Sequence, residues 1–496
     1  MLDNLWGVIA ENGAELEESA ETPVIRTPTV MRDALFSSFR DKLIHNPVLD
    51  RTLVSFQANK QAPFYSWFKY REGFSRQLVH YLLQKLMPQP GALLDPFAGA
   101  GSALFAASEL GWSTQGIEVL PVGVYAMKAR MVAERIDAKA FKQIAENTLS
   151  TDFSKHYDLQ YDFKHLAITK GAFPSKEEEQ LVGYISYCNR HILDEDVRLL
   201  LLYASFCILE DISYTRKDGQ YLRWDSRSGR SLSKKNFSKG NIFSFREAIT
   251  NKLHQIIADL TPAPAQSSLF IEENIQKLSN HQIDIQLGSC LDLLPRIPTD
   301  SIDFVLTSPP YANRYDYTRT YALELVYLGC GDEEVKRLRQ TMLSCTVENR
   351  DKRSQIQRYY EQLGRLSDFQ RVDSTFHHQA ALQEVLSILN SYREAGSLNN
   401  SHIARLVHNY FYEMCFVIFE LARLLRSGGM VAMVNDNVRY AGEEVPVDLI
   451  LSDMAETFGL KTRFIWTLGR GKGNSSQQMG SHGRTELRKC VYVWEK

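Results

Sequence analysis

Four consecutive residues, Ser308, Pro309, Pro310 and Tyr311, follow the apolar run IDFVL at 302–306 after one residue, Thr307. Each proline fixes its own φ and lacks a backbone N–H, and each favours extended geometry in the residue before it. A buried strand would therefore end here in a rigid segment that can expose carbonyl oxygens and direct a side chain. A Pro-Pro pair can also simply end a strand, so the motif needs support from elsewhere in the chain.

A second candidate is the glycine turn in DPFAGAGSA at 95–103. Gly99 and Gly101 allow a close approach of the backbone to a ligand, and the helix predicted after them begins with free N–H groups. The turn has neither the Lys-Ser/Thr of a phosphate-binding loop nor a full GxGxxG pattern, and its spacing indicates a nucleotide-type cofactor loop. About twenty residues later, Glu118 stands where a carboxylate can accept both hydroxyls of a ribose. A solvated strand end is the alternative for Glu118.

Alternating strands and helices are predicted to position these residues. A helix over 74–86 precedes the strand ALL, the glycine turn, a helix closed by Gly111, the strand STQGIEV and a helix to about Arg135. Such a run predicts an α/β fold, a doubly wound Rossmann-like parallel sheet with helices on its faces. The alternation resumes with IDIQL, IDFVL, a long helix to Leu425, MVAMVND, a helix after Pro446, TRFIWTLGR and KCVYVWE.

Two mainly helical stretches interrupt this alternation. The chain has 496 residues, enough for several domains or for one domain with large insertions, and we favour one sheet with two insertions. The predicted divisions are an N-terminal extension at 1–61, a catalytic domain from 62–135, 283–318 and 406–496, a first insertion at 136–282 and a second at 319–405.

Taken together, DPFAGAGS, GIEV and TSPPY resemble the S-adenosylmethionine-dependent amino methyltransferases of DNA, in particular the cytosine-N4-specific type. In that family the DPFxGxG loop holds the methionine end of the cofactor, the acid after the next strand holds its ribose, and [DNS]PP[YFW] is the catalytic loop. All three occur here in the same order, and the resemblance covers less than half of the chain. It implies a class I methyltransferase sheet and S-adenosyl-L-methionine as the cofactor.

The resemblance also implies the cofactor-binding residues. The glycine loop would line the methionine side and Glu118 the ribose, and an aromatic residue of WFKYREGFS, Phe74 or Phe68, would pack near the methionine or adenine. The family commonly has an acid after the glycine of the third strand, near the adenine amino group, where this chain has Ser289; either Ser289 or Asp292 would take that role. The set is Phe74, Asp95, Phe97, Gly99, Gly101, Glu118, Ser289 and Asp292.

For catalysis, the family implies that the Ser308 hydroxyl and the Pro309 carbonyl accept the two hydrogens of an exocyclic amino group, which turns its lone pair towards the methyl donor. Tyr311 would stack on a base rotated out of the duplex. Serine at the first position is typical of enzymes that act on the 4-amino group of cytosine, whereas aspartate or asparagine is typical of the adenine enzymes. The alternative is therefore an adenine-specific (6-amino) enzyme.

DNA contacts are predicted from the stretch 216–246, which has nine Lys or Arg against two Asp, with aromatic residues between them. A solvated basic loop is the alternative, and the second insertion, with VENRDKRSQIQRYY, competes as the target-recognition element. The basic segment 469–489 could form a loop over the active site or only a long hairpin. The candidate residues are Arg216, Lys217, Arg223, Arg227, Arg230, Lys234, Lys235, Arg314 and Arg319.

Composition excludes several other classes. Seven scattered cysteines without a CxxC pair indicate neither a disulfide framework nor a zinc site, and no metal is predicted. No apolar run is long enough for a membrane span and the N-terminal segment is acidic, so a cytoplasmic protein of a bacterial or archaeal cell is expected. Double-stranded DNA and a matching restriction endonuclease are the expected partners. An RNA methyltransferase and a catalytically silent DNA-binding subunit remain as alternatives.

Overall fold

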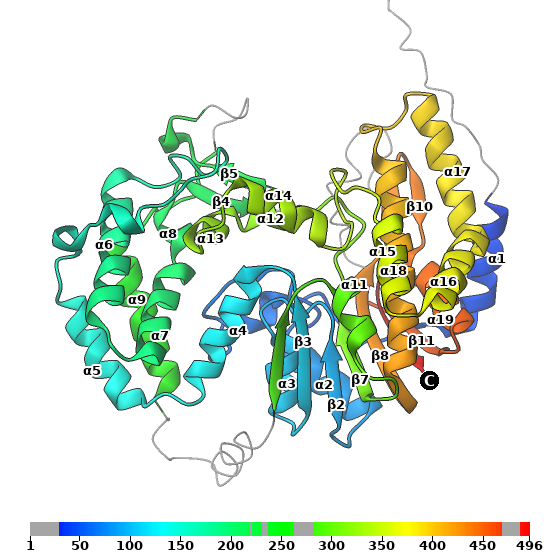
Figure 1. Cartoon of the computed structure of the whole chain (residues 1–496), viewed down its shortest axis with the longest axis horizontal. Coiled ribbons are helices and arrows are strands. Elements are labelled where there is room, and N and C mark those ends of the chain that lie inside the picture. The colour runs from blue at the N-terminus through cyan, green and yellow to red at the C-terminus, as the bar shows by residue number, and fades with distance from the viewer. Residues whose placement is uncertain (1–28, 219–220, 231–236, 262–281, 469–486) are drawn as a thin grey trace, which may run out of the picture.

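The computed structural model describes residues 29–218, 221–230, 237–261, 282–468 and 487–496. Within them, the chain is built on an eight-stranded sheet with the order β6-β3-β2-β7-β8-β12-β11-β1 (Figure 1). The strands are β1 (Leu43–His45), β2 (Ala92–Asp95), β3 (Ser113–Glu118), β6 (Ile283–Leu287), β7 (Ile302–Thr307), β8 (Leu425–Asp436), β11 (Lys461–Thr467) and β12 (Lys489–Glu495).

Strand direction decides which residues meet at the ligand-binding edge of this sheet. β12 runs antiparallel to both of its neighbours, β8 and β11, and the other pairings are parallel. The carboxyl ends of β2, β3, β6, β7 and β8 therefore meet at one edge, where doubly wound folds bind ligands. Because β12 runs the other way, it brings its first residues to that edge. The α/β prediction is confirmed, with one reversed strand.

Helices cover both faces of the sheet. Leu93 and Phe304 belong to the apolar core on one face, with α2 and α3. Leu94 and Val305 belong to the core on the other face, with α18 and α19. Strands buried on both faces need apolar residues at successive positions, which accounts for the continuous apolar runs in β2 and β7. The helices are α2 (Arg76–Leu86), α3 (Ser102–Ser108), α18 (Ile403–Leu424) and α19 (Val447–Thr457).

The first predicted insertion folds as a group of helices with its own apolar core beside α4 (Pro121–Ala133) (Figure 1). Three of its helices begin at a side chain that accepts a backbone N–H, namely Asp137, Asp194 and Ser244. An antiparallel hairpin lies in the basic stretch, where a loop is predicted. The elements are α5 (Ala138–Leu149), α6 (Ser175–His191), α7 (Glu195–Cys207), α8 (Leu209–Ile212), α9 (Phe245–Leu260), β4 (Thr215–Asp218) and β5 (Tyr221–Trp224).

The second predicted insertion is divided between two cores. Tyr321 and Leu325, from its first helices, join the apolar core of the first insertion. Val372 and Leu382, from its later helices, join the core that includes α18. The helices of the range 319–405 therefore pack into two different apolar cores. The helices are α12 (Tyr317–Thr320), α13 (Ala322–Tyr327), α14 (Asp332–Thr341), α15 (Arg353–Gln362), α16 (Leu366–His378) and α17 (Ala380–Glu394).

The remaining elements complete the domain. On α1 (Val30–Phe39), Arg32 forms ion pairs with Glu384 at 2.8 Å and with Glu443 at 3.0 Å, which tie α1 to α17 and to the hairpin of β9 and β10. No helix among the described residues has the length and apolar character needed to cross a membrane. All seven cysteines are unpaired, and six of them are buried. The short elements are α11 (Cys290–Leu293), β9 (Val438–Tyr440) and β10 (Glu443–Val445).

Candidate active site

A cavity of about 760 Å³, counted to its open mouth, lies at the carboxyl edge of the sheet. The glycine turn after β2, the end of β3 and the start of α11 form its floor and sides. The segment 70–74 and the turn that carries Ser308 and Pro310 complete the lining, together with Thr341–Leu343 at the end of α14. Three widely separated parts of the sequence, singled out by their motifs, therefore meet around one space.

The glycine turn is closely packed against its surroundings. Gly99 has φ +55°, and a Cβ there would lie 2.7 Å from the Tyr70 ring. Gly123, in the first turn of α4, allows that helix to approach so closely that a Cβ would collide with the Gly99 carbonyl. Gly101 has φ +83° and precedes α3, but it does not line the cavity. The positive φ lets Gly101 turn the chain into α3, and its contact with the cofactor stays a prediction.

Two buried carboxylates face the cavity. Glu118 accepts hydrogen bonds from the backbone N–H groups of Gly99 and Leu120, each at 2.7 Å. Burial raises the pKa of Glu118 to about 7, and these N–H donors act in the opposite direction. Burial also raises the pKa of Asp95 to about 7, against hydrogen bonds from Thr307 and Phe97. Both acids can therefore change protonation near neutral pH and accept hydrogen bonds from a polar ligand.

A second chamber adjoins the first. It has about 1030 Å³ of empty space, counted to its mouth, and the Ser308–Tyr311 turn lines it together with Tyr315 and Lys489. Ser308 lines both chambers, as do Glu72, Gly73, Phe74 and Tyr317. The Ser308 Oγ lies 3.5 Å from the Tyr311 hydroxyl. The serine therefore stands at the junction between a space around the glycine turn and a space open to a second ligand.

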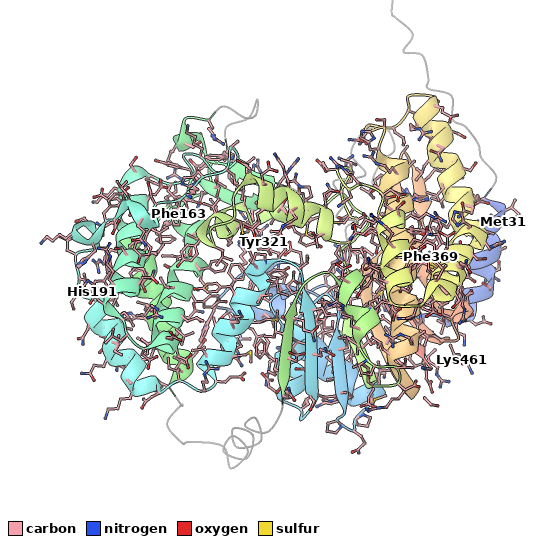
Figure 2. The ribbon with its side chains drawn as sticks, in the orientation of Figure 1. Met31, Phe163, His191, Tyr321, Phe369 and Lys461 are labelled. Atoms are coloured by element: carbon pink, nitrogen blue, oxygen red, sulfur yellow. The ribbon has the colours of Figure 1, made fainter. Side chains whose placement is uncertain are left out.

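Glu72 lines both chambers and belongs to no motif that predicts a function. Its carboxylate accepts hydrogen bonds from the hydroxyls of Tyr315 and Tyr321. Tyr70, two residues earlier, stacks on the Tyr321 ring with a centroid distance of 5.1 Å and an interplanar angle of 11°. Tyr321, labelled in Figure 2, belongs to the helical span that also supports the first insertion. In the sequence, Glu72 could be connected with the site only through its position, with Tyr70, inside the aromatic segment WFKYREGFS.

The remaining cofactor candidates separate into two groups. Asp95, Phe97, Gly99, Glu118, Phe74 and Ser289 line the first chamber. Ser289 is buried and its hydroxyl accepts the N–H of Leu291 at the start of α11. Asp292 lines a neighbouring cavity with Lys352 and Tyr359, which Ser289 also borders, so only Ser289 of the two alternatives lines the first chamber. Phe68 packs on Phe206 with ring centroids 5.0 Å apart, away from the chamber lining.

Lys217 does not fit its predicted role. Its side chain is 4% exposed, and its ammonium pairs with the buried carboxylate of Glu324. The same ammonium lies over the rings of Phe68 and Tyr321, at 5.0 and 4.6 Å from their centroids. Since a buried and paired ammonium is not available to a phosphate group, the prediction of a DNA contact is wrong for Lys217.

Of the other candidate arginines in the basic stretch, Arg216, Arg223 and Arg227 are exposed and Arg230 is half-buried. Arg227 pairs with Asp225 at 2.7 Å. Arg223 and Arg230 lie over aromatic rings, of Phe237 and Trp224 respectively, each at 4.1 Å from the centroid. Arg216, next to Lys217 on β4, is exposed. These contacts shape the hairpin region, and the exposed guanidinium groups can still meet a phosphate.

Two candidates lie beyond the serine turn. Arg314, with φ +67°, donates to the Asn399 side chain at 3.1 Å. Arg319 pairs with Asp316 at 3.1 Å and with Glu348 at 3.0 Å. Lys234 and Lys235 lie outside the described residues, as does most of the basic segment 469–489.

Comparisons with known proteins identify relatives of this chain. The chain is 45% identical over 468 residues to the Type II methyltransferase M.AvaI of a Nostoc species, covering 93% of this chain and 92% of that protein, and equally similar to M.AvaI of Anabaena variabilis. It is 39% identical over 466 residues to the Type II methyltransferase M.BsoBI of Geobacillus stearothermophilus, covering 90% of this chain and 88% of that protein. Neither a family model nor a solved structure matches the chain. At this identity over nearly its whole length, the chain belongs to the family of Type II methyltransferases.

Proposed function

We propose that this protein transfers a methyl group from S-adenosyl-L-methionine to the exocyclic 4-amino group of a cytosine rotated out of double-stranded DNA, at a specific site. The observation that carries the proposal is the position of Ser308 at the junction of two chambers, one around Gly99 and Glu118 and one open beside Tyr311. Such a pair of spaces suits a methyl donor and an acceptor base that must meet at one point.

The first chamber fits the proposed cofactor in size and chemistry. Its volume falls within the roughly 300–1,000 Å³ of small-molecule sites, and its lining combines apolar side chains with two buried carboxylates. In the proposal, the methionine side of the cofactor is held by Asp95, Phe97 and Gly99, and Glu118 accepts the ribose hydroxyls. Phe74 packs near the methionine or adenine, and Ser289 lies near the adenine amino group. When bound, S-adenosyl-L-methionine supplies an electrophilic methyl group on a sulfonium.

The protein's own contribution is to orient the acceptor. The amino nitrogen of cytosine is a poor nucleophile because its lone pair is delocalised into the ring. The Ser308 hydroxyl and the Pro309 carbonyl accept its two hydrogens and so turn the lone pair out of conjugation, towards the first chamber. The two prolines keep these acceptors rigid, and Tyr311 stacks on the extruded base, which offsets an unstacking cost of a few kcal/mol. No covalent intermediate with the protein is needed.

Serine at position 308 favours cytosine over adenine as the target. An adenine-specific enzyme is the second candidate, because the same acceptors can serve a 6-amino group. The candidate arginines of the first insertion, Arg216, Arg223, Arg227 and Arg230, with Arg314 and Arg319, supply phosphate contacts in this proposal. We further propose that the enzyme acts in the cytoplasm, as the modification arm of a restriction-modification system with a partner endonuclease. This last step is supported by the names of the Type II relatives.

Transfer of tritium from labelled cofactor tests the proposal. The wild-type protein should label plasmid DNA and not total RNA. Ser308→Ala should reduce the rate on the order of 10²-fold, as expected when one fixed polar group at a reacting centre is removed. Ser391→Ala, at an exposed position of α17, is the matched control and should keep full activity. Label in RNA alone, or cofactor binding without transfer, would replace the proposal by one of its rivals.

The modified base must be identified separately. Nuclease digestion of methylated DNA followed by mass spectrometry should yield N4-methylcytosine. Mapping the modified positions in DNA from cells that express the protein then gives the recognition sequence. N6-methyladenine as the product would leave the site assignments in place and change the target base.

A further inference from the structure

Lys489 opens β12 and lies at the carboxyl edge of the sheet because β12 is reversed relative to its neighbours. It is paired in register with Asp436, the last residue of β8, and its Nζ lies 3.5 Å from the Asp436 carboxylate. Its side chain is 27% exposed, and it lines the second chamber with Ser308, Pro309 and Tyr311. The fold therefore places a lysine ammonium beside the serine turn.

Lys489 is connected to the serine turn through Tyr311. The Nζ lies 5.9 Å from the centroid of the Tyr311 ring, and the Tyr311 hydroxyl lies 3.5 Å from the Ser308 Oγ. The ammonium thus borders the space in which a base would stack on Tyr311 with its amino group at Ser308. Burial lowers the pKa of Lys489, but Tyr311 and Asp436 act more strongly in the other direction, so the pKa is raised and the ammonium keeps its proton.

The hydrogen-bonding edge of the target base has a fixed pattern. The amino group of cytosine donates, and the adjacent ring atom N3 and the O2 oxygen accept. In adenine, N1 takes the place of N3. Ser308 and the Pro309 carbonyl are both acceptors for the amino group, so the ring nitrogen needs a donor from another part of the chamber. An ammonium carries three N–H donors and no acceptor, which suits this atom.

We propose that Lys489 is a specificity-determining residue that donates a hydrogen bond to the ring nitrogen next to the amino group of the target base, while Asp436 holds the lysine in place. The inference rests on the proposed function and extends it from the reacting group to the recognition of the base. It assigns a positioning role to the ammonium, because proton transfer to the ring nitrogen would weaken the amino lone pair.

A comparison of two substrates and four proteins tests this role. One duplex carries cytosine at the mapped target position, and the other carries 3-deazacytosine, in which N3 is replaced by C–H. The analogue also changes the intrinsic reactivity of its amino group, but this change is the same for every protein variant. The proteins are the wild type, Lys489→Met, Lys489→Arg and Lys461→Met. Lys461 is the matched control, an exposed lysine that opens β11 at the opposite edge of the sheet.

For the wild type and Lys461→Met, kcat/KM should be lower with 3-deazacytosine than with cytosine for two reasons. The first is the altered reactivity of the analogue's amino group, called here the intrinsic factor. The second is the lost hydrogen bond, which should cost roughly a further 10–100-fold, the range for a hydrogen bond to a charged group. Lys489→Met should lose about the same factor with cytosine and show only the intrinsic factor with the analogue. Lys489→Arg should keep part of the discrimination. The dissociation constant of the cofactor should stay unchanged in Lys489→Met, because Lys489 does not line the first chamber.

The assignment would be overturned if Lys489→Met lost the same fraction of kcat/KM on both duplexes, or if it lost none. Arg71, another cation in the described lining of the chamber, is the internal rival: discrimination that disappears in Arg71→Met and persists in Lys489→Met would transfer the role to Arg71. If the modified base is adenine, the same experiment uses 1-deazaadenine. Absence of transfer from the wild type to any DNA would refute the proposed function itself, an outcome distinct from a defect confined to the lysine variants.

Discussion

The hydroxyl of Thr307 donates a 2.7 Å hydrogen bond to the carboxylate of Asp95. Asp95 ends β2 and begins the glycine turn, whereas Thr307 ends the adjacent strand β7 and directly precedes Ser308. Both side chains are buried. This single bond therefore joins the loop that shapes the first chamber to the turn that carries the serine.

Thr307→Val removes this bond with little change in volume. We expect the free energy of unfolding to fall by about 1–3 kcal/mol, because the buried Asp95 carboxyl loses a partner. The serine turn also loses its connection to the glycine turn, so the rate of methyl transfer should fall further than the loss of folded protein explains. Urea unfolding and single-turnover transfer measure the two effects.

Thr114→Val provides the control for that variant. Thr114 is buried like Thr307 and lies on β3, the other neighbour of β2, but its hydroxyl has no hydrogen-bond partner among the described residues. Removing an unpartnered buried hydroxyl should be neutral or stabilising. Equal destabilisation by both variants would mean that the Asp95–Thr307 bond contributes nothing specific.

The fold was largely predictable because the strands of this sheet carry continuous apolar runs. ALL and IDFVL are buried on both faces, and their flanking glycines and prolines mark where they end. β1 was missed because this strand has only three residues, Leu43–His45, and they are mostly exposed. The direction of β12 was not predictable either, since KCVYVWE has the same pattern in a parallel or an antiparallel strand.

The residues of the candidate site were predictable where they lie in short motifs of consecutive residues. The glycine turn, Glu118 and the serine turn are local motifs, and the fold brings them together. Glu72 and Lys489 could not be identified, because their positions depend on tyrosines of the helical insertion and on the reversal of β12. Lys217 illustrates the opposite error: a basic stretch predicts exposed cations, but the acid that buries this one, Glu324, lies about a hundred residues away in the sequence.

We expect the free energy of unfolding of the ligand-free protein to fall as the pH rises. Burial raises the pKa of Asp95 from 3.8 and that of Glu118 from 4.5, in both cases to about 7. Between pH 4 and 7 the folded state therefore keeps protons that the unfolded chain has released. The free energy of unfolding should decrease on the order of a few kcal/mol across this window and level off above it.

Glu118→Gln and Asp95→Asn test this pH dependence. Each variant should flatten the decrease, measured as the unfolding free energy at pH 5, 6, 7 and 8. The slope is the readout, because an amide also changes the local hydrogen bonds and so shifts the absolute value. A slope that both variants leave unchanged would place the titrating groups elsewhere in the molecule.

Gly123→Ala should weaken cofactor binding while leaving most of the fold intact. A Cβ at this position would collide with the Gly99 carbonyl, so either α4 or the glycine turn must move. We expect at least a tenfold increase in the cofactor dissociation constant, on the order of the 1–3 kcal/mol cost of overpacking. Gly331→Ala is the control, since it has open space around the added methyl group. Equal affinity of the two variants would show that the turn tolerates displacement.

Arg216 and Lys217 are adjacent on β4, but substitution of Arg216 should affect DNA binding and substitution of Lys217 should affect stability. Arg216→Ala should weaken DNA binding and reduce the slope of log affinity against log salt by about 1, because one exposed cation is lost from the phosphate contacts. Lys217→Met should leave that slope unchanged and lower stability by about 3–5 kcal/mol, because the buried Glu324 carboxylate loses its partner. Adding Glu324→Gln to Lys217→Met should recover much of that stability, since no unpaired charge remains. A reduced salt slope in the Lys217 variant would mean that the ion pair opens to meet DNA.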